Sequence, residues 1–218
     1  MSERPEEMHA TVQILGGLLE IDRVVNDHYR LVELWHREPV TAPNEVLPIS
    51  FIMQNHVRNF QLWHVEDEAR VKEVPDSVIA DCKRRIDKLN QERNDFVEQV
   101  DIYLLSQLHK FHLPDESAPL HSETVGMMFD RLSILSLKLF HMNEQVQRTD
   151  VDLEHRRKCA DKVEALRQQR ADLQDCLSSC WRQIITGRRR FKVYRQFKMY
   201  NDDTLNMAVV AARKKLAP

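Results

Sequence analysis

Glycine is scarce in this sequence. The 218 residues include four glycines, whereas an average protein contains about 7% glycine. Gly-rich phosphate-binding loops and turn-dense β-sandwiches need more glycine than this, and helix interiors disfavour it. The shortage therefore predicts a mostly helical protein in which any functional site is built from helix faces.

Several other features are also absent. No apolar run approaches the ~20 residues of a membrane span, and the first residues, MSERPEEMHA, lack the basic start and apolar stretch of a signal peptide. The four cysteines form no CxxC pair. We therefore expect a cytoplasmic protein with reduced thiols. The net charge of −2 gives no general attraction to nucleic acid, so neither extended nucleic acid nor a membrane is an expected partner.

Proline and glycine divide the chain into segments with a hydrophobic period of 3.6 residues. The five long segments are 6–37, 49–73, 76–111, 122–148 and 151–186. No segment alternates as a strand would, and 42% hydrophobic residues are enough to form a core. We predict an all-α fold: a single-domain bundle of about five long helices over residues 5–186, followed by a short C-terminal appendage over 187–218.

Polar side chains recur on the apolar faces of these segments. In 49–73, the arc that carries Ile52, Phe60 and Trp63 also carries His56, Asn59, Glu66, Asp67 and Arg70. On or beside the apolar faces of the later segments lie Asn90, Arg93, Asn94, Asp101, Asp130, Lys138, His141 and Arg170. Because a buried charge without a partner costs several kcal/mol, these groups must pair with one another or line a wet cleft.

The appendage has a basic and aromatic pattern. Its rings are Phe191, Tyr194, Phe197 and Tyr200, and they alternate with Lys192, Arg195 and Lys198. Cations beside flat rings suit phosphates and nucleotides. In the competing interpretation, the rings dock on the bundle and the cations stay in water. If the segment is functional, it closes over a pocket and brings Lys198, Tyr200 and Asn201 to an anionic ligand.

These patterns favour a polar pocket between the helices, because titratable groups gathered in a cleft are typical of functional sites. We expect it to bind a small anionic molecule, such as a phosphorylated sugar or a nucleotide-like ligand, with acid–base or hydrolytic chemistry as an extension. The candidates for that chemistry are His56, Asp67, Asp130 and His141. The candidates for ligand binding are Asn59, Glu66, Arg70, Asn90, Arg93, Asn94, Asp101, Lys138, Arg170, Lys198, Tyr200 and Asn201. The alternative is a non-catalytic assembly or adaptor module whose buried polar network is structural.

A metal site is not favoured by the residue spacing. His56 and His64 make a poor ligand pair on one helix, and Glu33-x-x-His36 lacks the second Glu-x-x-His of di-iron bundles. The segment Glu98-x-x-Asp101 matches only half of the magnesium motif of helical nucleotide pyrophosphatases. We therefore assign no metal ligands, and the cofactor stays open. The long amphipathic helices are compatible with a homodimer and with a monomer.

Several ordered motifs resemble a known family. Residues 59–70 read N-x-x-L-W-x-x-E-D-x-A-R, residues 83–95 read K-R-x-I-D-x-L-N-x-x-R-N-D, and residues 130–135 read DRLSIL. The last motif, within 194–202, combines YRQ with KMYND. Together they resemble the bacterial family of unknown function DUF4254. The resemblance implies a soluble helical protein of about this length, and it implies no reaction.

Overall fold

The computed structural model describes residues 5–195, 197 and 204–216. Its helices are α1 (Pro5–Gly16), α2 (Ile21–Trp35), α3 (Ile49–Glu68), α4 (Asp76–His109), α5 (Val125–Gln147), α6 (Leu153–Ile185) and α7 (Met207–Leu216). Within these residues the only β interaction is an isolated bridge between Leu120 and Arg190. The predicted all-α class is therefore confirmed.

The first predicted segment, 6–37, is two helices rather than one. α1 ends at Gly16, and the amide of Gly17 donates to the carbonyl of Gln13 in the turn that follows. Leu15 and Leu19 on either side of the break are both buried. Because the apolar period continues across the turn, the sequence pattern resembles that of one uninterrupted helix.

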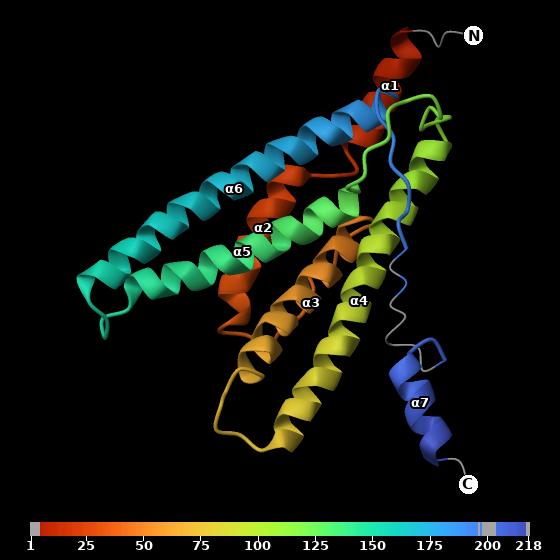
Figure 1. Cartoon of the computed structure of the whole chain (residues 1–218). Coiled ribbons are helices and arrows are strands. Elements are labelled where there is room, and N and C mark those ends of the chain that lie inside the picture. Colours follow the sequence, from red (N-terminus) through yellow and green to blue (C-terminus); the bar gives the residue numbers. More distant parts are fainter. Residues whose placement is uncertain (1–4, 196, 198–203, 217–218) are drawn as a thin grey trace.

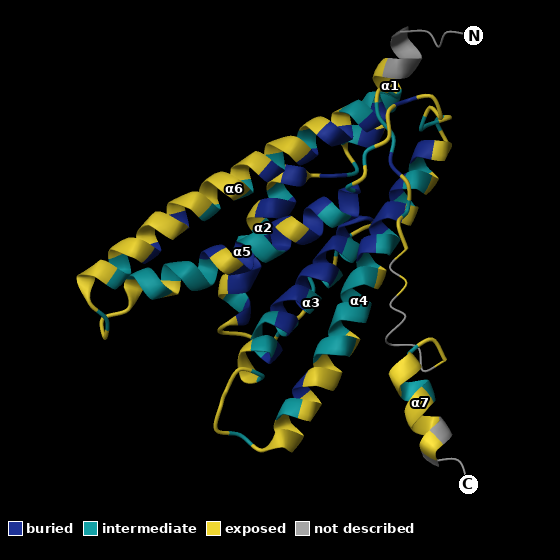
Figure 2. Cartoon of the chain, in the orientation of Figure 1, coloured by how far each residue is buried: buried dark blue, intermediate teal, exposed yellow. Residues whose placement is uncertain are grey.

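The long helices form two hairpins that diverge from one end of the molecule. Figure 1 shows α3 beside α4 and α5 beside α6, with α2 between the two hairpins. α5 contacts α2, α3, α4 and α6, as expected for a helix that is apolar nearly all round. In Figure 2 the buried residues concentrate on α2, α3 and α5, whereas the outer surface of α6 is largely exposed.

The start of α5 is fixed against α4 by an unusually close approach. Thr124 caps the helix, since its Oγ1 accepts from the amide of Met127 at 3.2 Å. The amide of Gly126 donates to Oδ1 of Asp101 at 2.8 Å, and a Cβ at this glycine would lie only 2.6 Å from the carbonyl oxygen of Val97. A side chain at this position would therefore push the two helices apart.

The C-terminal appendage begins by docking on the bundle. Gly187 adopts a φ of 69° just after α6, where glycine is favoured. Phe191 is buried in the core, whereas Phe197 is 82% exposed. The sequence-predicted site residues Lys198, Tyr200 and Asn201 lie outside the described residues. None of the described helices combines the length and the apolar character that crossing a membrane requires.

Candidate functional site

A buried carboxylate joins three helices at the centre of the bundle. Oδ1 of Asp130 on α5 accepts from Nδ2 of Asn55 at 3.0 Å, from Nδ2 of Asn59 at 2.9 Å and from Nε of Arg93 at 2.8 Å. Oδ2 accepts from Nη2 of the same arginine. Burial opposes the charge of Arg93, but the hydrogen bond and charge of Asp130 outweigh it and raise the pKa of this arginine. The ion pair is thus compensated within the core.

His56 extends this cluster toward α2. Its Nε2 lies 2.8 Å from the carbonyl oxygen of His28, and its Nδ1 lies 2.7 Å from Oγ of Ser133. Because a carbonyl only accepts, Nε2 carries the proton and Nδ1 accepts from the serine hydroxyl. The Ser133 oxygen accepts in turn from Nδ2 of Asn59 at 3.0 Å. Burial lowers the pKa of His56 to about 3, so the ring is neutral and both of its nitrogens are occupied.

We call this set the Asp130 network. Its members are Asn55, His56, Asn59, Arg93, Asp130 and Ser133. The expected acid–base roles of His56 and Asp130 would require a free lone pair or a mobile proton facing a ligand. In the structure both nitrogens of His56 and both oxygens of Asp130 instead have hydrogen-bond partners within the network, which favours a structural role for these two side chains.

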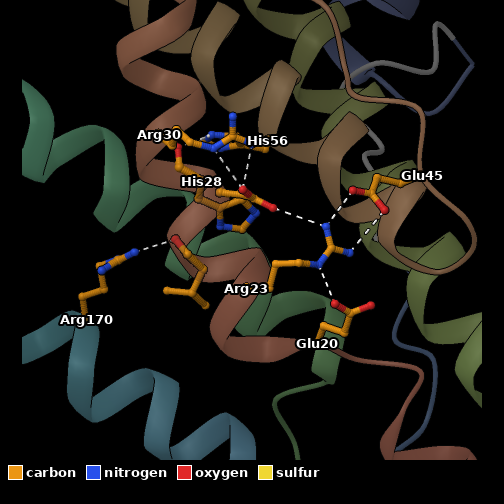
Figure 3. A network of polar contacts seen from close by, with 9 residues as sticks. Glu20, Arg23, His28, Arg30, Glu45, His56 and Arg170 are labelled. Carbon is orange, nitrogen blue, oxygen red and sulfur yellow. Dashed lines mark hydrogen bonds and ion pairs between the residues drawn. The ribbon is translucent and has the colours of Figure 1, made fainter.

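Arg170 was expected in the same inward set, but the structure places it elsewhere. Its Nη2 donates to the carbonyl of Val25 on α2, and burial lowers the pKa of its guanidinium. Figure 3 shows Arg170 reaching the backbone of α2, the helix that carries His28. No hydrogen bond joins Arg170 to Asp130 or Arg93 among the described residues.

One cleft adjoins the network, and a second cleft adjoins the first. The first, which we call the Arg93 cleft, has a volume of about 330 Å³ between α3, α4 and α5. Its lining residues are Asn59, Leu62, Trp63, Glu66, Asp67, Arg70, Asn90, Arg93, Ile134 and Leu137. The sequence-predicted residues among them are Asn59, Glu66, Asp67, Arg70, Asn90 and Arg93. The structure thus brings six candidates from α3, the turn that follows it and α4 to one cavity.

Three candidates are placed differently from expectation. Asp67 and Arg70 are exposed rather than inward. Asp67 lies in the exposed last turn of α3, and Arg70 lies beyond Glu68, where the helix has ended and the helical spacing no longer applies. Arg70 forms an ion pair with Glu66 at 3.1 Å. Asn94 is half-buried on α4 and lines neither cleft.

Asp101 lies apart from the clefts, at the contact between α4 and the start of α5. Burial raises the pKa of its carboxyl to about 7, and Glu98 adds repulsion. Hydrogen bonds from Thr124 and Gly126 act in the opposite direction. This position makes Asp101 a cross-link between helices rather than a ligand contact.

The second cleft, which we call the Lys138 cleft, has a volume of about 630 Å³ between α3, α5 and α6. It shares Trp63 and Asp67 with the Arg93 cleft. Its lining residues are Trp63, Asp67, Lys138, His141, Met142, Glu144, Gln145, Lys162, Ala165, Leu166 and Gln169. Within the described part of the chain, neither Lys138 nor Lys162 forms an ion pair. Two unpaired cations from different helices therefore line one cavity, together with the carboxylates of Asp67 and Glu144.

Three histidines converge beside this cleft. His36 caps the C-terminal end of α2, His64 lies on α3 and His141 lies on α5; one ring nitrogen from each lies within 4.8 Å of the others. The ring centroid of His36 lies 5.1 Å from each of the other two rings. His141 stacks on Trp63 with 4.7 Å between centroids and 5° between planes. Burial lowers the pKa of His64 and of His141, which favours neutral imidazoles.

Comparison with known families assigns the chain. The family model for DUF4254, a protein of unknown function, matches residues 49–193, which is about two-thirds of the chain. The chain belongs to this family. The match spans α3 to α6 and therefore includes the Asp130 network and both clefts, whereas His36 lies outside the matched residues. No curated protein and no solved structure matches the chain.

Sequence reasoning missed several residues that matter in this DUF4254 chain. Asn55 carried a signal, because it precedes Asn59 by four residues and so shares its helix face. Ser133 and Lys162 carried none, since neither has a distinctive spacing. The histidine cluster was invisible for a different reason: its three members come from three helices, and only tertiary packing brings them together.

Proposed function

We propose that the protein binds a small anionic ligand, of the class of phosphorylated sugars or nucleotide-like molecules, in the Lys138 cleft. The observation that carries the proposal is the pair of lysines from α5 and α6, which face this cleft without an ion pair in the described chain. Two other cations near the polar core already have partners: Arg93 pairs with Asp130 and Arg70 with Glu66. Lys138 and Lys162 are therefore the cations that remain to pair with an anion in this cleft.

The rest of the lining suits an organic anion. Gln145 and Gln169 supply amide donors, while Trp63, Ala165 and Leu166 give an apolar floor. A mostly apolar cavity with a few placed polar groups is the usual form of a small-molecule site. Any acid–base chemistry in this cleft falls to His141 and Asp67, because His56 and Asp130 are saturated within the scaffold.

A thermal-shift and calorimetric screen tests the proposal. The probes are inorganic phosphate, glucose 6-phosphate and adenosine monophosphate, with unphosphorylated glucose as the uncharged comparison. We expect at least one phosphorylated probe to raise the melting temperature of the wild type, because a ligand that binds only the folded state stabilises it. The double variant Lys138→Ala/Lys162→Ala should lose that response.

Lys158→Ala is the matched control. Lys158 lies on α6 one turn from Lys162, pairs with Glu154 at 2.6 Å and does not line the cleft. Its variant should respond to the probes as the wild type does. An equal response in the double variant, or no response to any charged probe, would exclude this cleft as an anion site.

The alternative function, a non-catalytic assembly module, is favoured by one observation. The Asp130 network is closed on itself, as expected for a joint that fixes helix register. Under that function the phosphorylated probes stabilise neither the wild type nor any variant, so the same screen decides between the two.

A further inference from the structure

The three-histidine cluster leaves binding capacity unused. Nε2 of His141 is buried and has no hydrogen-bond partner among the described residues. Leaving such a buried polar atom unsatisfied costs about 1–3 kcal/mol. Aromatic packing alone would be better served by a phenylalanine, which has no nitrogen to satisfy. We therefore expect a ligand that accepts the lone pair of this nitrogen.

In two of the three histidines, His36 and His141, the other ring nitrogen has the kind of partner found in metal sites. Nδ1 of His36 lies 2.7 Å from the carbonyl oxygen of Val32, and Nδ1 of His141 lies 2.7 Å from Oε2 of Glu144. Both acceptors fix the proton on Nδ1, so that Nε2 keeps its lone pair. Metal-ligating histidines characteristically donate their second ring N–H to a carbonyl or carboxylate, which orients the ring.

The spacing is close to that of a zinc site. Tetrahedral zinc binds imidazole nitrogen at about 2.0–2.1 Å, which places the ligating nitrogens about 3.4 Å apart. The three nitrogens here lie within 4.8 Å of one another. His36 is exposed at the end of α2, so its side chain can shift more readily than the two half-buried histidines. A small decrease in the distances between the three nitrogens would give the spacing of a tetrahedral zinc site.

We propose that His36, His64 and His141 bind a divalent transition-metal ion of the kind that imidazole prefers, represented by Zn²⁺. Among the described residues no carboxylate joins these three histidines in the cluster, so the ligand set is neutral. The ion keeps its charge and an open fourth position, which takes water or an anionic oxygen. Phe60, Trp63 and Phe140 pack against the three rings and hold them in place. This inference goes beyond the proposed function and stands without it.

Isothermal titration of the chelator-treated full-length protein with Zn²⁺ tests the site. We expect one equivalent to bind. His36→Gln, His64→Gln and His141→Gln should each abolish that equivalent, and circular dichroism should show that the helices persist. Glu144→Gln should weaken binding by roughly 10–100-fold, because it removes the carboxylate that orients His141. Co²⁺, whose visible absorption is intense only at low coordination number, should report the same losses.

His155→Gln is the control. His155 lies on α6 with Nε2 3.5 Å from the sulfur of Cys159, an arrangement that could also attract zinc. If His155→Gln removes the bound equivalent, or if the wild type binds no Zn²⁺, the three-histidine site is refuted. Lys138→Ala/Lys162→Ala should bind Zn²⁺ as the wild type does, so loss of anion binding and loss of metal binding are separate results.

Discussion

Two histidines on α3, eight residues apart, belong to clusters of opposite character. His56 lies in the Asp130 network, where both of its ring nitrogens have partners. His64 lies in the three-histidine cluster, where Nε2 of the neighbouring His141 is buried without one. A saturated polar cluster stabilises a fold, whereas an unsaturated one is poised for a ligand. The partners of the ring nitrogens therefore distinguish His56 from His141, although buried His28 beside His56 also lacks ring-nitrogen partners among the described residues.

The largest expected effect comes from breaking the saturated cluster. Asp130→Asn removes the charge that compensates the buried Arg93 and should lower the free energy of unfolding by about 3–5 kcal/mol. The double variant Arg93→Met/Asp130→Asn should recover part of this loss, because no uncompensated charge remains. Chemical denaturation monitored by circular dichroism measures both.

An exposed ion pair provides the comparison for that result. Glu164 and Arg167 lie 3.5 Å apart on the surface of α6. Glu164→Gln should change the free energy of unfolding by less than about 0.5 kcal/mol. An equally small effect of Asp130→Asn would show that the network does not stabilise the fold, and the contrast between the clusters would fail.

The second effect depends on pH. The pKa of Asp101 is about 7 in the folded state and about 3.9 in an unfolded chain. Because the pKa is raised in the folded state, the contribution of this carboxyl to the free energy of unfolding is fully present below about pH 4 and is lost as the pH rises through 7. Asp101→Asn should therefore gain stability relative to the wild type by up to about 4 kcal/mol between about pH 4 and pH 8.

Denaturation at several pH values checks the Asp101 prediction. Asparagine keeps an oxygen that can accept from the amide of Gly126, so the cap on α5 is preserved. The Glu164→Gln variant corrects for the general pH response of the protein. A difference between Asp101→Asn and wild type that stays constant with pH would contradict the raised pKa.

Helical periodicity was enough to predict the class of fold. It predicted one helix over 6–37 because the buried Leu15 and Leu19 maintain the period across a real break. Helical projection placed Asn59 and Arg93 facing inward, but it could not show that Asp130 joins them. The hydrogen bonds from Asn59 and Arg93 to Asp130 join residues that are 71 and 37 positions apart in sequence. The residue pattern within a single helix contains no information about such contacts.

The smallest effect compares the two histidines of α3 directly. In metal-free protein, His56→Gln should lower the free energy of unfolding by about 1–3 kcal/mol, because it removes the ring that bonds to the carbonyl of His28 and the hydroxyl of Ser133. His64→Gln removes mainly ring contacts, such as that with Phe60 at 4.5 Å, and should cost less than about 1 kcal/mol. Adding Zn²⁺ should raise the melting temperature of the wild type and of His56→Gln, but not of His64→Gln. Equal zinc responses in the two variants would contradict the assignment of His56 to the scaffold and of His64 to a metal site.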